Sequence, residues 1–244
     1  MTVFLCGNSH LAALHKGYRQ LGKADEKYKF VPLVGANQDN TSFSVLEHEG
    51  VRFTRENTFN MFHKATKMTH IGTDGHWGIC LGDPTYSIYR GPQWQKCRPN
   101  IFPTDGKRPI SLSMIDSISR YDQRYFQEFI MQLKMFGVKF FIIATPTSDV
   151  DFHDSDNEET RNVRLFLQLR ARQKFEEWLA EQKIDFVGLP PDTLEREGGL
   201  KKEFRNQTRQ NGKRDFNHAN GAFGSRMIKQ VNEYLSLSAG NLIA

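Results

Sequence analysis

Two kinds of hydrophobic pattern follow each other along the chain, short apolar runs and longer segments in which apolar residues recur every three or four positions. A short apolar run bounded by Gly, Pro or polar residues is typical of a buried β-strand. Such runs predict strands at 2–6, 29–34, 77–81, 139–144 and 184–189.

Segments with helical spacing follow or separate these runs. One of them begins directly after the first strand, and another ends at Gly137, which is a good helix C-cap. Strands that alternate with helices predict an α/β fold, with a parallel sheet covered on both faces. Apolar residues on one face predict helices at about 11–21, 115–136, 163–179 and 223–235.

Two regions fit this scheme poorly. Residues 39–76 are polar and mixed in period, and we expect an inserted lid or loop region there. Residues 89–109 are rich in Pro and Gly and predict a long surface loop. The chain shows neither an internal repeat nor a linker, so we expect one domain over residues 1–244.

The composition agrees with one soluble globular domain, at 38% hydrophobic and 25% charged residues. The apolar runs are shorter than a membrane span, and the first strand leaves no room for a secretion signal, so we expect a cytoplasmic protein without a membrane partner. Cys6 and Cys80 lie in strand-like runs, and with Cys97 they make an odd count of three. We therefore expect reduced, buried thiols rather than disulfides.

The net charge of +5 comes largely from residues 200–214, a basic stretch with a single aromatic residue. Nucleic-acid grooves of single-strand binders interleave basic and aromatic side chains, so this stretch predicts a solvated loop and no nucleic-acid partner. Residues 148–159 are acidic and predict an exposed loop. The sequence does not indicate the oligomeric state.

The turn between the first strand and the first helix reads Gly-Asn-Ser-His, with the serine at position 9. Asn and Ser are favoured helix N-cap residues, which is one interpretation of Ser9. The same turn lies where ligands bind in parallel α/β sheets, at the carboxyl end of the strands, so Ser9 is also a candidate nucleophile.

Near the other end of the chain, Asp215 and His218 stand directly before the last predicted helix. At a spacing of three, a carboxylate can orient and polarise an imidazole, which makes the pair a candidate general base with its orienting group. A helix cap or a solvated ion pair would explain the same spacing.

Gly7-Asn8-Ser9 and Asp215-x-x-His218, at the two ends of an α/β chain, resemble the motifs of the SGNH, or GDSL, hydrolase family, with Asn in place of Asp in the first motif. The resemblance implies a three-layer flavodoxin-like fold with a central parallel sheet of about five strands. It also implies that Ser9 is the nucleophile, His218 the general base and Asp215 the residue that holds the imidazole.

An oxyanion hole is also implied by the resemblance. Its donors would be the backbone N–H of Ser9, a glycine at Gly35 or Gly82, and an asparagine side chain, for which Asn37 is the candidate. Asp83 stands near the position where the family has its asparagine. An ionised carboxylate cannot donate a hydrogen bond to an oxyanion, so this part of the site departs from the family pattern.

We therefore expect a serine hydrolase of the SGNH type that cleaves an ester, such as O-acetyl groups of a saccharide or a similar small ester, without a cofactor or metal. An O-acyltransferase that uses a sugar hydroxyl in place of water is the nearest alternative. Four aromatic residues are candidates for stacking on a sugar, although core packing would explain each of them: Trp77, Tyr86, Tyr89 and Trp94.

Two further alternatives belong to other classes. His70, Asp74, His76 and Asp83 are metal-type ligands within a short stretch, which would suit a metal-dependent phosphoesterase. A non-catalytic binding protein with a degenerate hydrolase site is the other alternative, because fold and function separate readily.

Overall fold

The computed structural model describes residues 2–22, 27–34, 41–81, 88, 91–148, 156–208, 212, 215 and 217–240. Its centre is a five-stranded parallel sheet in the order β2-β1-β5-β8-β9. Each strand falls on a run predicted from the sequence, although the last is shorter than its run. The strands are β1 (Val3–Gly7), β2 (Tyr28–Pro32), β5 (His76–Cys80), β8 (Phe140–Ile143) and β9 (Phe186–Val187).

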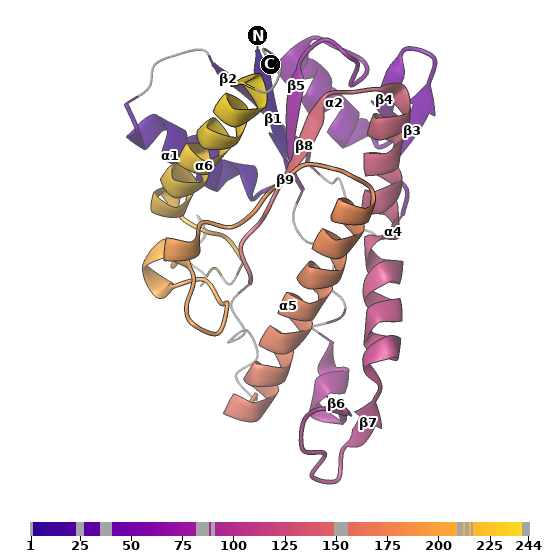
Figure 1. Ribbon diagram of the computed structural model, residues 1–244, viewed down its shortest axis with the longest axis vertical. Coiled ribbons are helices and arrows are strands. Elements are labelled where there is room, and N and C mark those ends of the chain that lie inside the picture. The colour runs from indigo at the N-terminus through magenta and orange to yellow at the C-terminus, as the bar shows by residue number, and fades with distance from the viewer. Residues whose placement is uncertain are drawn as a thin grey trace.

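Helices cover both faces of this sheet, as expected for an α/β fold (Figure 1). One face packs against α1 (Leu11–Gln20) and α6 (Gly221–Gly240), which lie side by side. The other packs against α2 (Glu56–Thr66), α4 (Leu112–Phe136) and α5 (Glu158–Glu181). Helix α4 ends at Gly137 in a left-handed conformation, φ 79°, as the sequence predicts.

Strand β1 shows how the sheet separates two apolar cores. Its side chains alternate between the faces, so Phe4 and Cys6 join the core under α4 and α5, while Val3 and Leu5 join the core under α1 and α6. Every residue of β1 is buried. A central strand buried on both faces explains why its sequence is a continuous apolar run.

Residues 41–76 contain a β-hairpin and a helix that the sequence analysis did not predict. The hairpin pairs β3 (Ser44–Glu47) with β4 (Gly50–Phe53), and α2 follows it. Their buried side chains belong to the core on the α4 face of the sheet. This region is therefore built into the core, and its role as a lid stays a prediction.

The expectation of a long surface loop at 89–109 is confirmed for residues 100–107, which are mostly exposed, but it is wrong for the described segments on either side. They form η1 (Pro92–Gln95), β6 (Cys97–Pro99) and β7 (Arg108–Ile110), the last two paired in parallel at the lower end of Figure 1. Trp94 is buried in a small third core, and buried Arg98 pairs with Glu159 of α5. A Pro-rich composition indicates irregular backbone and gives no information about tertiary contacts of this kind.

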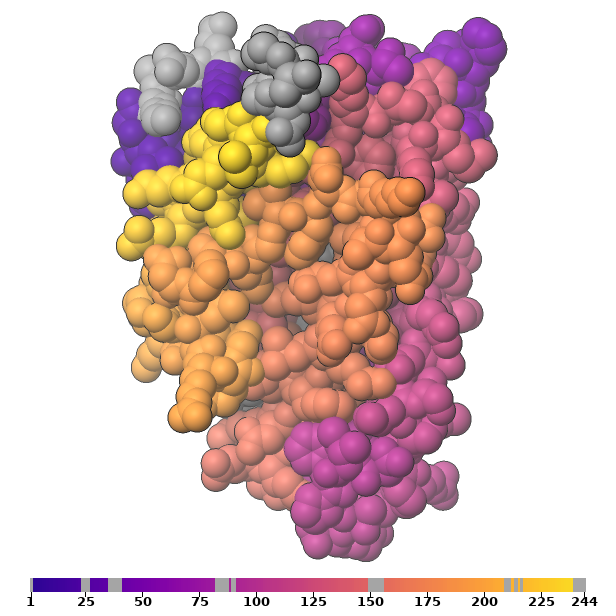
Figure 2. Space-filling view, viewed as in Figure 1, coloured from indigo at the N-terminus to yellow at the C-terminus, as the bar shows by residue number. Residues whose placement is uncertain are grey.

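The remaining short elements, η2 (Pro191–Thr193) and η3 (Lys202–Phe204), lie between β9 and α6. Figure 2 shows the face of the molecule on which this segment lies alongside α6. Leu200 is buried, and its backbone N–H donates to Thr147 Oγ1 at 3.1 Å, beyond the end of β8. The segment is thus anchored at the carboxyl end of the sheet.

The three cysteines are free thiols, with Cys6 and Cys80 buried as predicted and Cys97 half-buried. Burial raises the pKa of Cys80 to about 12, so this thiol stays protonated and unreactive at neutral pH. Among the described residues, no helix has both the length and the apolar character needed to cross a membrane.

Candidate active site

Ser9 lies between the end of β1 and the start of α1, at the carboxyl edge of the sheet. Its Oγ is 2.8 Å from Nε2 of His218, which is 209 positions away in the chain. The first turn of α1 is closed by backbone bonds to the carbonyls of residues 8–10, and the helix has no side-chain cap. The interpretation of Ser9 as an N-cap is therefore wrong.

His218 and Asp215 form the pair that their spacing predicts. Nδ1 of His218 is 2.9 Å from Oδ1 and 3.0 Å from Oδ2 of Asp215. Since an ionised carboxylate only accepts hydrogen bonds, Nδ1 carries the imidazole proton and Nε2 is left to accept from the Ser9 hydroxyl.

The Asp215 carboxylate is held in its ionised form. Its side chain is only 3% exposed, and this burial by itself raises the pKa. The Asn217 backbone N–H, the His218 imidazole and the Asn206 side chain donate to the carboxylate, and together they bring its pKa below the usual value. A charged acceptor therefore faces His218 at neutral pH.

Two glycines bring the serine and the histidine together, because they let α1 and α6 approach at backbone contact. A Cβ at Gly17 would lie 2.1 Å from the Gly224 carbonyl carbon, and a Cβ at Gly224 would lie 1.8 Å from the Ala13 carbonyl oxygen. Ser9 lies two residues before α1, and His218 lies three residues before α6. The close helix pair thus sets the distance between their side chains.

Asn206 is a residue of the site that the sequence analysis missed. Its side-chain Nδ2 donates to Asp215 Oδ2 at 3.2 Å, and its backbone N–H donates to the His218 carbonyl at 2.8 Å. It lies within the basic stretch 200–214, for which a solvated loop was expected. The described residues 201–208 are exposed or half-buried, and backbone hydrogen bonds pair them with the segment before α6. A lone asparagine carries no motif, so the sequence offered no signal.

Of the donors expected for an oxyanion hole, only Ser9 belongs to the described residues. Within the described part of the chain, the Ser9 backbone N–H donates to no other group. Asn8 shapes this turn, because its Nδ2 donates to the Leu81 carbonyl after β5 and its Oδ1 accepts from the His10 N–H at 3.1 Å. The other expected donors, Gly35, Asn37 and Gly82, and the neighbouring Asp83, lie outside the described residues.

The two tryptophans among the sugar-stacking candidates are core residues. Trp77 stacks on Phe4 with ring centroids 4.3 Å apart, and the Trp94 indole N–H donates to the Ile88 carbonyl. Both side chains are buried, so neither is available to a ligand at the surface. Tyr86 and Tyr89 lie outside the described residues.

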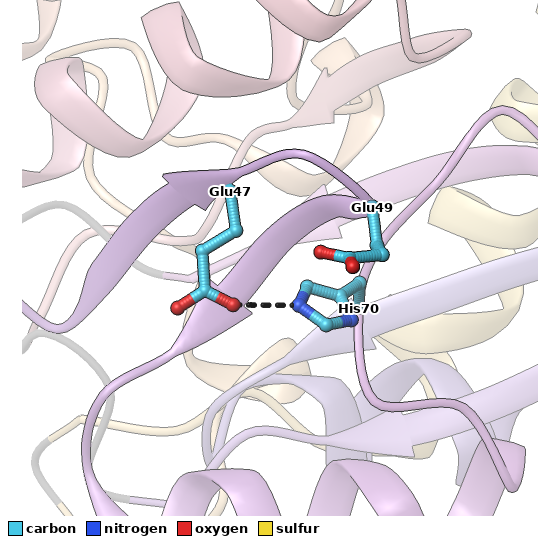
Figure 3. Close-up of side chains that lie close together, drawn as sticks. All are labelled: Glu47, Glu49 and His70. Carbon is cyan, nitrogen blue, oxygen red and sulfur yellow. Dashed lines mark hydrogen bonds and ion pairs between the residues drawn. The ribbon is translucent and has the colours of Figure 1, made fainter.

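The metal ligands proposed from the sequence do not gather into one set among the described residues. His70 instead faces Glu47, with Nε2 2.9 Å from Oε2, and Glu49 lies beside them (Figure 3). The Arg52 guanidinium donates to the other oxygen of Glu47 at 2.6 Å, so a positively charged side chain already pairs with this carboxylate. His76 packs edge-on against Phe141, and Asp83 is outside the described residues.

No protein-family model matches the chain, and no curated protein matches it in sequence. Its fold, however, is similar to that of solved hydrolase structures. A GDSL-like lipase from Bacteroides thetaiotaomicron aligns over 97% of this chain and 88% of its own, with 10% identity and a TM-score of 0.51.

Two Streptomyces enzymes align equally widely. An extracellular lipase from Streptomyces rimosus aligns over 96% of this chain and 99% of its own, with 8% identity and a TM-score of 0.50. A phospholipase A1 from Streptomyces albidoflavus aligns over 95% of this chain and 98% of its own, with 8% identity and a TM-score of 0.50. At such low identity, the similarity shows a shared fold.

Proposed function

We propose that this chain, which has the fold of the SGNH, or GDSL, hydrolases, is a serine ester hydrolase with Ser9 as its nucleophile. One observation carries the proposal, an unbroken path of hydrogen bonds from Ser9 Oγ to His218 Nε2 at 2.8 Å and from His218 Nδ1 to Asp215 at 2.9 Å. A hydroxyl, a base and an orienting carboxylate in this geometry are the components of nucleophilic acyl transfer.

In the acylation step, the Ser9 oxygen attacks the ester carbonyl while His218 Nε2 takes the serine proton. The imidazolium that forms is stabilised by Asp215, which is buried and ionised. His218 then gives its proton to the leaving alcohol as the tetrahedral intermediate collapses to an acyl-enzyme on Ser9.

In the deacylation step, water attacks the acyl-enzyme and His218 Nε2 takes the water proton. Collapse of the second tetrahedral intermediate releases the carboxylic acid and returns the proton to Ser9. The cycle consumes one ester and one water and needs no cofactor. A sugar hydroxyl in the place of water would give an O-acyltransferase by the same steps.

The developing oxyanion needs donors that point at it before the reaction begins. The Ser9 backbone N–H, which donates to no other group among the described residues, suits this role at the start of α1. One such donor is worth about 3 kcal/mol of transition-state stabilisation in acyl-transfer enzymes. Gly35, Gly82 and Asn37 remain our proposals for the other donors.

As substrate we propose a short O-acyl ester, with O-acetyl groups of a saccharide as the first class to test. The two sequence motifs support an ester in general, and the saccharide was suggested by the aromatic candidates, of which Tyr86 and Tyr89 lie outside the described residues. Trp77 and Trp94 do not support it, because their rings are buried in the cores. A panel of acyl lengths on aryl and sugar esters, assayed for release of acid and for transfer to added sugar, separates esterase from transferase.

The nucleophile is tested by replacing Ser9. We expect Ser9→Ala to lower turnover of a small aryl acetate by about four orders of magnitude or more and to abolish labelling by a fluorophosphonate. Ser9→Cys keeps a nucleophilic atom and should accumulate acyl-enzyme. Ser117→Ala, which changes an exposed serine of α4, is the matched control. Full turnover in folded Ser9→Ala would overturn the proposal.

A further inference from the structure

We infer that Asn206 is a positioning residue that holds both the carboxylate and the histidine of the candidate triad. This role rests on the proposed function. The evidence is that one residue makes two hydrogen bonds to the two members of the pair. Its side chain donates to Asp215 Oδ2 at 3.2 Å, and its backbone N–H donates to the His218 carbonyl at 2.8 Å.

The backbone around Asn206 forms a short antiparallel pairing with the segment that carries the pair. The Asp215 N–H donates to the Gln207 carbonyl at 3.1 Å, and the Asn220 N–H donates to the Phe204 carbonyl at 2.9 Å. Asn206 lies in the middle of this pairing. Its side chain is therefore presented to Asp215 by backbone that is fixed on both sides of it.

This pairing is anchored to the rest of the fold. At one end, the Leu200 N–H donates to Thr147 beyond β8. At the other end, the Asn220 side chain caps α6 by accepting from the N–H of Phe223 at 3.2 Å, and its Nδ2 donates to the Glu203 carbonyl at 2.7 Å. Asn206 thus connects the triad to the sheet and to α6.

The Asp215 carboxylate has hydrogen bonds on both oxygens. Oδ1 accepts from the Asn217 backbone at 3.1 Å and Oδ2 accepts from Asn206, while His218 Nδ1 lies between the two oxygens. Rotation of the carboxylate about its Cβ–Cγ bond would break one of these contacts. Asn206 therefore fixes the plane in which Asp215 meets the imidazole, and with it the direction of Nε2 toward Ser9.

The neighbouring residue supplies a matched control. Gln207 takes part in the same pairing through its backbone carbonyl, and its side chain is exposed. Removing the Gln207 side chain leaves the pairing in place, whereas removing the Asn206 amide takes a donor from Asp215. We would compare Asn206→Ala and Asn206→Leu with Gln207→Ala and Gln207→Leu.

We expect kcat for aryl acetate to fall about tenfold or more in both Asn206 variants, with KM unchanged, because a hydrogen bond to a charged group is lost. Both Gln207 variants should match wild type. In proton NMR, the low-field resonance of the His218 Nδ1 proton should shift and exchange faster in both Asn206 variants and in neither Gln207 variant. Melting midpoints, measured in parallel, verify that each variant is folded at the assay temperature.

The outcomes separate this role from the proposed function. If wild type cleaves esters and both Asn206 variants keep the kcat of the Gln207 variants, Asn206 is not a positioning residue. A raised KM at unchanged kcat would assign it to substrate binding and overturn the inference as well. If wild type cleaves no ester, the proposed function fails, and the His218 resonance still decides whether Asn206 holds the pair.

Discussion

Asn8, the residue before the candidate nucleophile, uses both ends of its amide. Nδ2 donates to the Leu81 carbonyl beyond β5, and Oδ1 accepts from the His10 N–H at 3.1 Å. The related family motif has Asp at this position. A carboxylate could make only the second of these contacts, because it has no proton to donate. An asparagine at position 8 can therefore bind the Leu81 carbonyl that follows β5, whereas an aspartate cannot.

The first prediction is that Asn8→Asp, which restores the family motif, lowers the activity. We expect kcat on aryl acetate to fall about tenfold or more, because the hydrogen bond to Leu81 is lost and a carboxylate then faces the Leu81 carbonyl in the turn that carries Ser9. Asn232→Asp makes the same change on α6, where the amide oxygen accepts from Lys27 and Tyr28. Equal kcat in the two variants would contradict the prediction.

At the scale of elements, the α1–α6 pair holds the two ends of the candidate triad together. Their contact is close because Gly17 and Gly224 have no side chains. A methyl group at Gly224 would meet backbone atoms of α1, which cannot move aside without shifting the helix. Displacement of α1 relative to α6 changes the distance from Ser9 to His218.

The second prediction is that Gly224→Ala lowers both stability and kcat. Overpacking costs about 1 to 3 kcal/mol of unfolding free energy, and the separated helices weaken the contact between serine and histidine. Urea unfolding and aryl acetate kinetics measure the two effects.

Gly221→Ala is the control for this change. It adds the same methyl group to α6, but its Cβ would lie 2.7 Å from the end of the flexible Gln20 side chain, which can move. We expect Gly221→Ala to keep wild-type kcat. If Gly224→Ala were as stable and as active as Gly221→Ala, close helix packing would not set the site.

The β3–β4 hairpin is tied to the residues after α2 by charged groups. Glu47 at the end of β3 accepts hydrogen bonds from Arg52 on β4 and contacts His70 beyond α2, the second contact being drawn in Figure 3. These two partners lower the pKa of Glu47 to about 2. Because the folded-state pKa lies below the ordinary value of 4.5, the ionised carboxylate stabilises the fold above that pH. The contribution is lost as the pH falls toward 2.

The third prediction concerns this pH dependence. Glu47→Gln should lower the melting temperature at neutral pH, and the difference from wild type should shrink below pH 4.5 and vanish near pH 2. Glu49→Gln, two positions further along the hairpin turn, is the control for removing a carboxylate. A difference that stays constant over this pH range would mean that the charge of Glu47 does not stabilise the hairpin.

For the molecule as a whole, the candidate chemistry that we propose uses groups of the chain itself. The hydrogen-bonded path from Ser9 to Asp215 provides a nucleophile, a base and its orienting group. The metal-dependent alternative drew on His70, Asp74, His76 and Asp83. The first three belong to the described residues and form no common ligand set there.

The fourth prediction is that dialysis against EDTA leaves kcat and KM for aryl acetate unchanged, while a serine-directed fluorophosphonate abolishes turnover. The expected reason is that His218, rather than a metal ion, activates the nucleophile. The metal content after dialysis is the control for incomplete removal, and adding Zn²⁺ or Mn²⁺ back tests whether any loss is reversible. Loss of activity on chelation and its return with metal would favour the phosphoesterase alternative.

The sequence by itself determined the strands of the central sheet, most of the helices that cover it, and the order of the candidate triad along the chain. Strand and helix patterns depend on residues a few positions apart, so the five strands of the sheet and the helices α1, α4, α5 and α6 were predictable. The helix α2 and the β3–β4 hairpin were not, because their apolar positions are few and polar residues separate them. Two short motifs identified Ser9, Asp215 and His218 as candidates but did not show that their side chains are in contact.

Only the tertiary structure decided how these parts come together. The approach of α1 and α6, the contact of Asn206 with Asp215, and the burial of Trp77 and Trp94 each depend on segments far apart in the chain. A pattern of neighbouring residues cannot report which distant backbone a side chain will face. The meeting of Ser9 with His218, 209 positions away, is therefore a property of the packed fold.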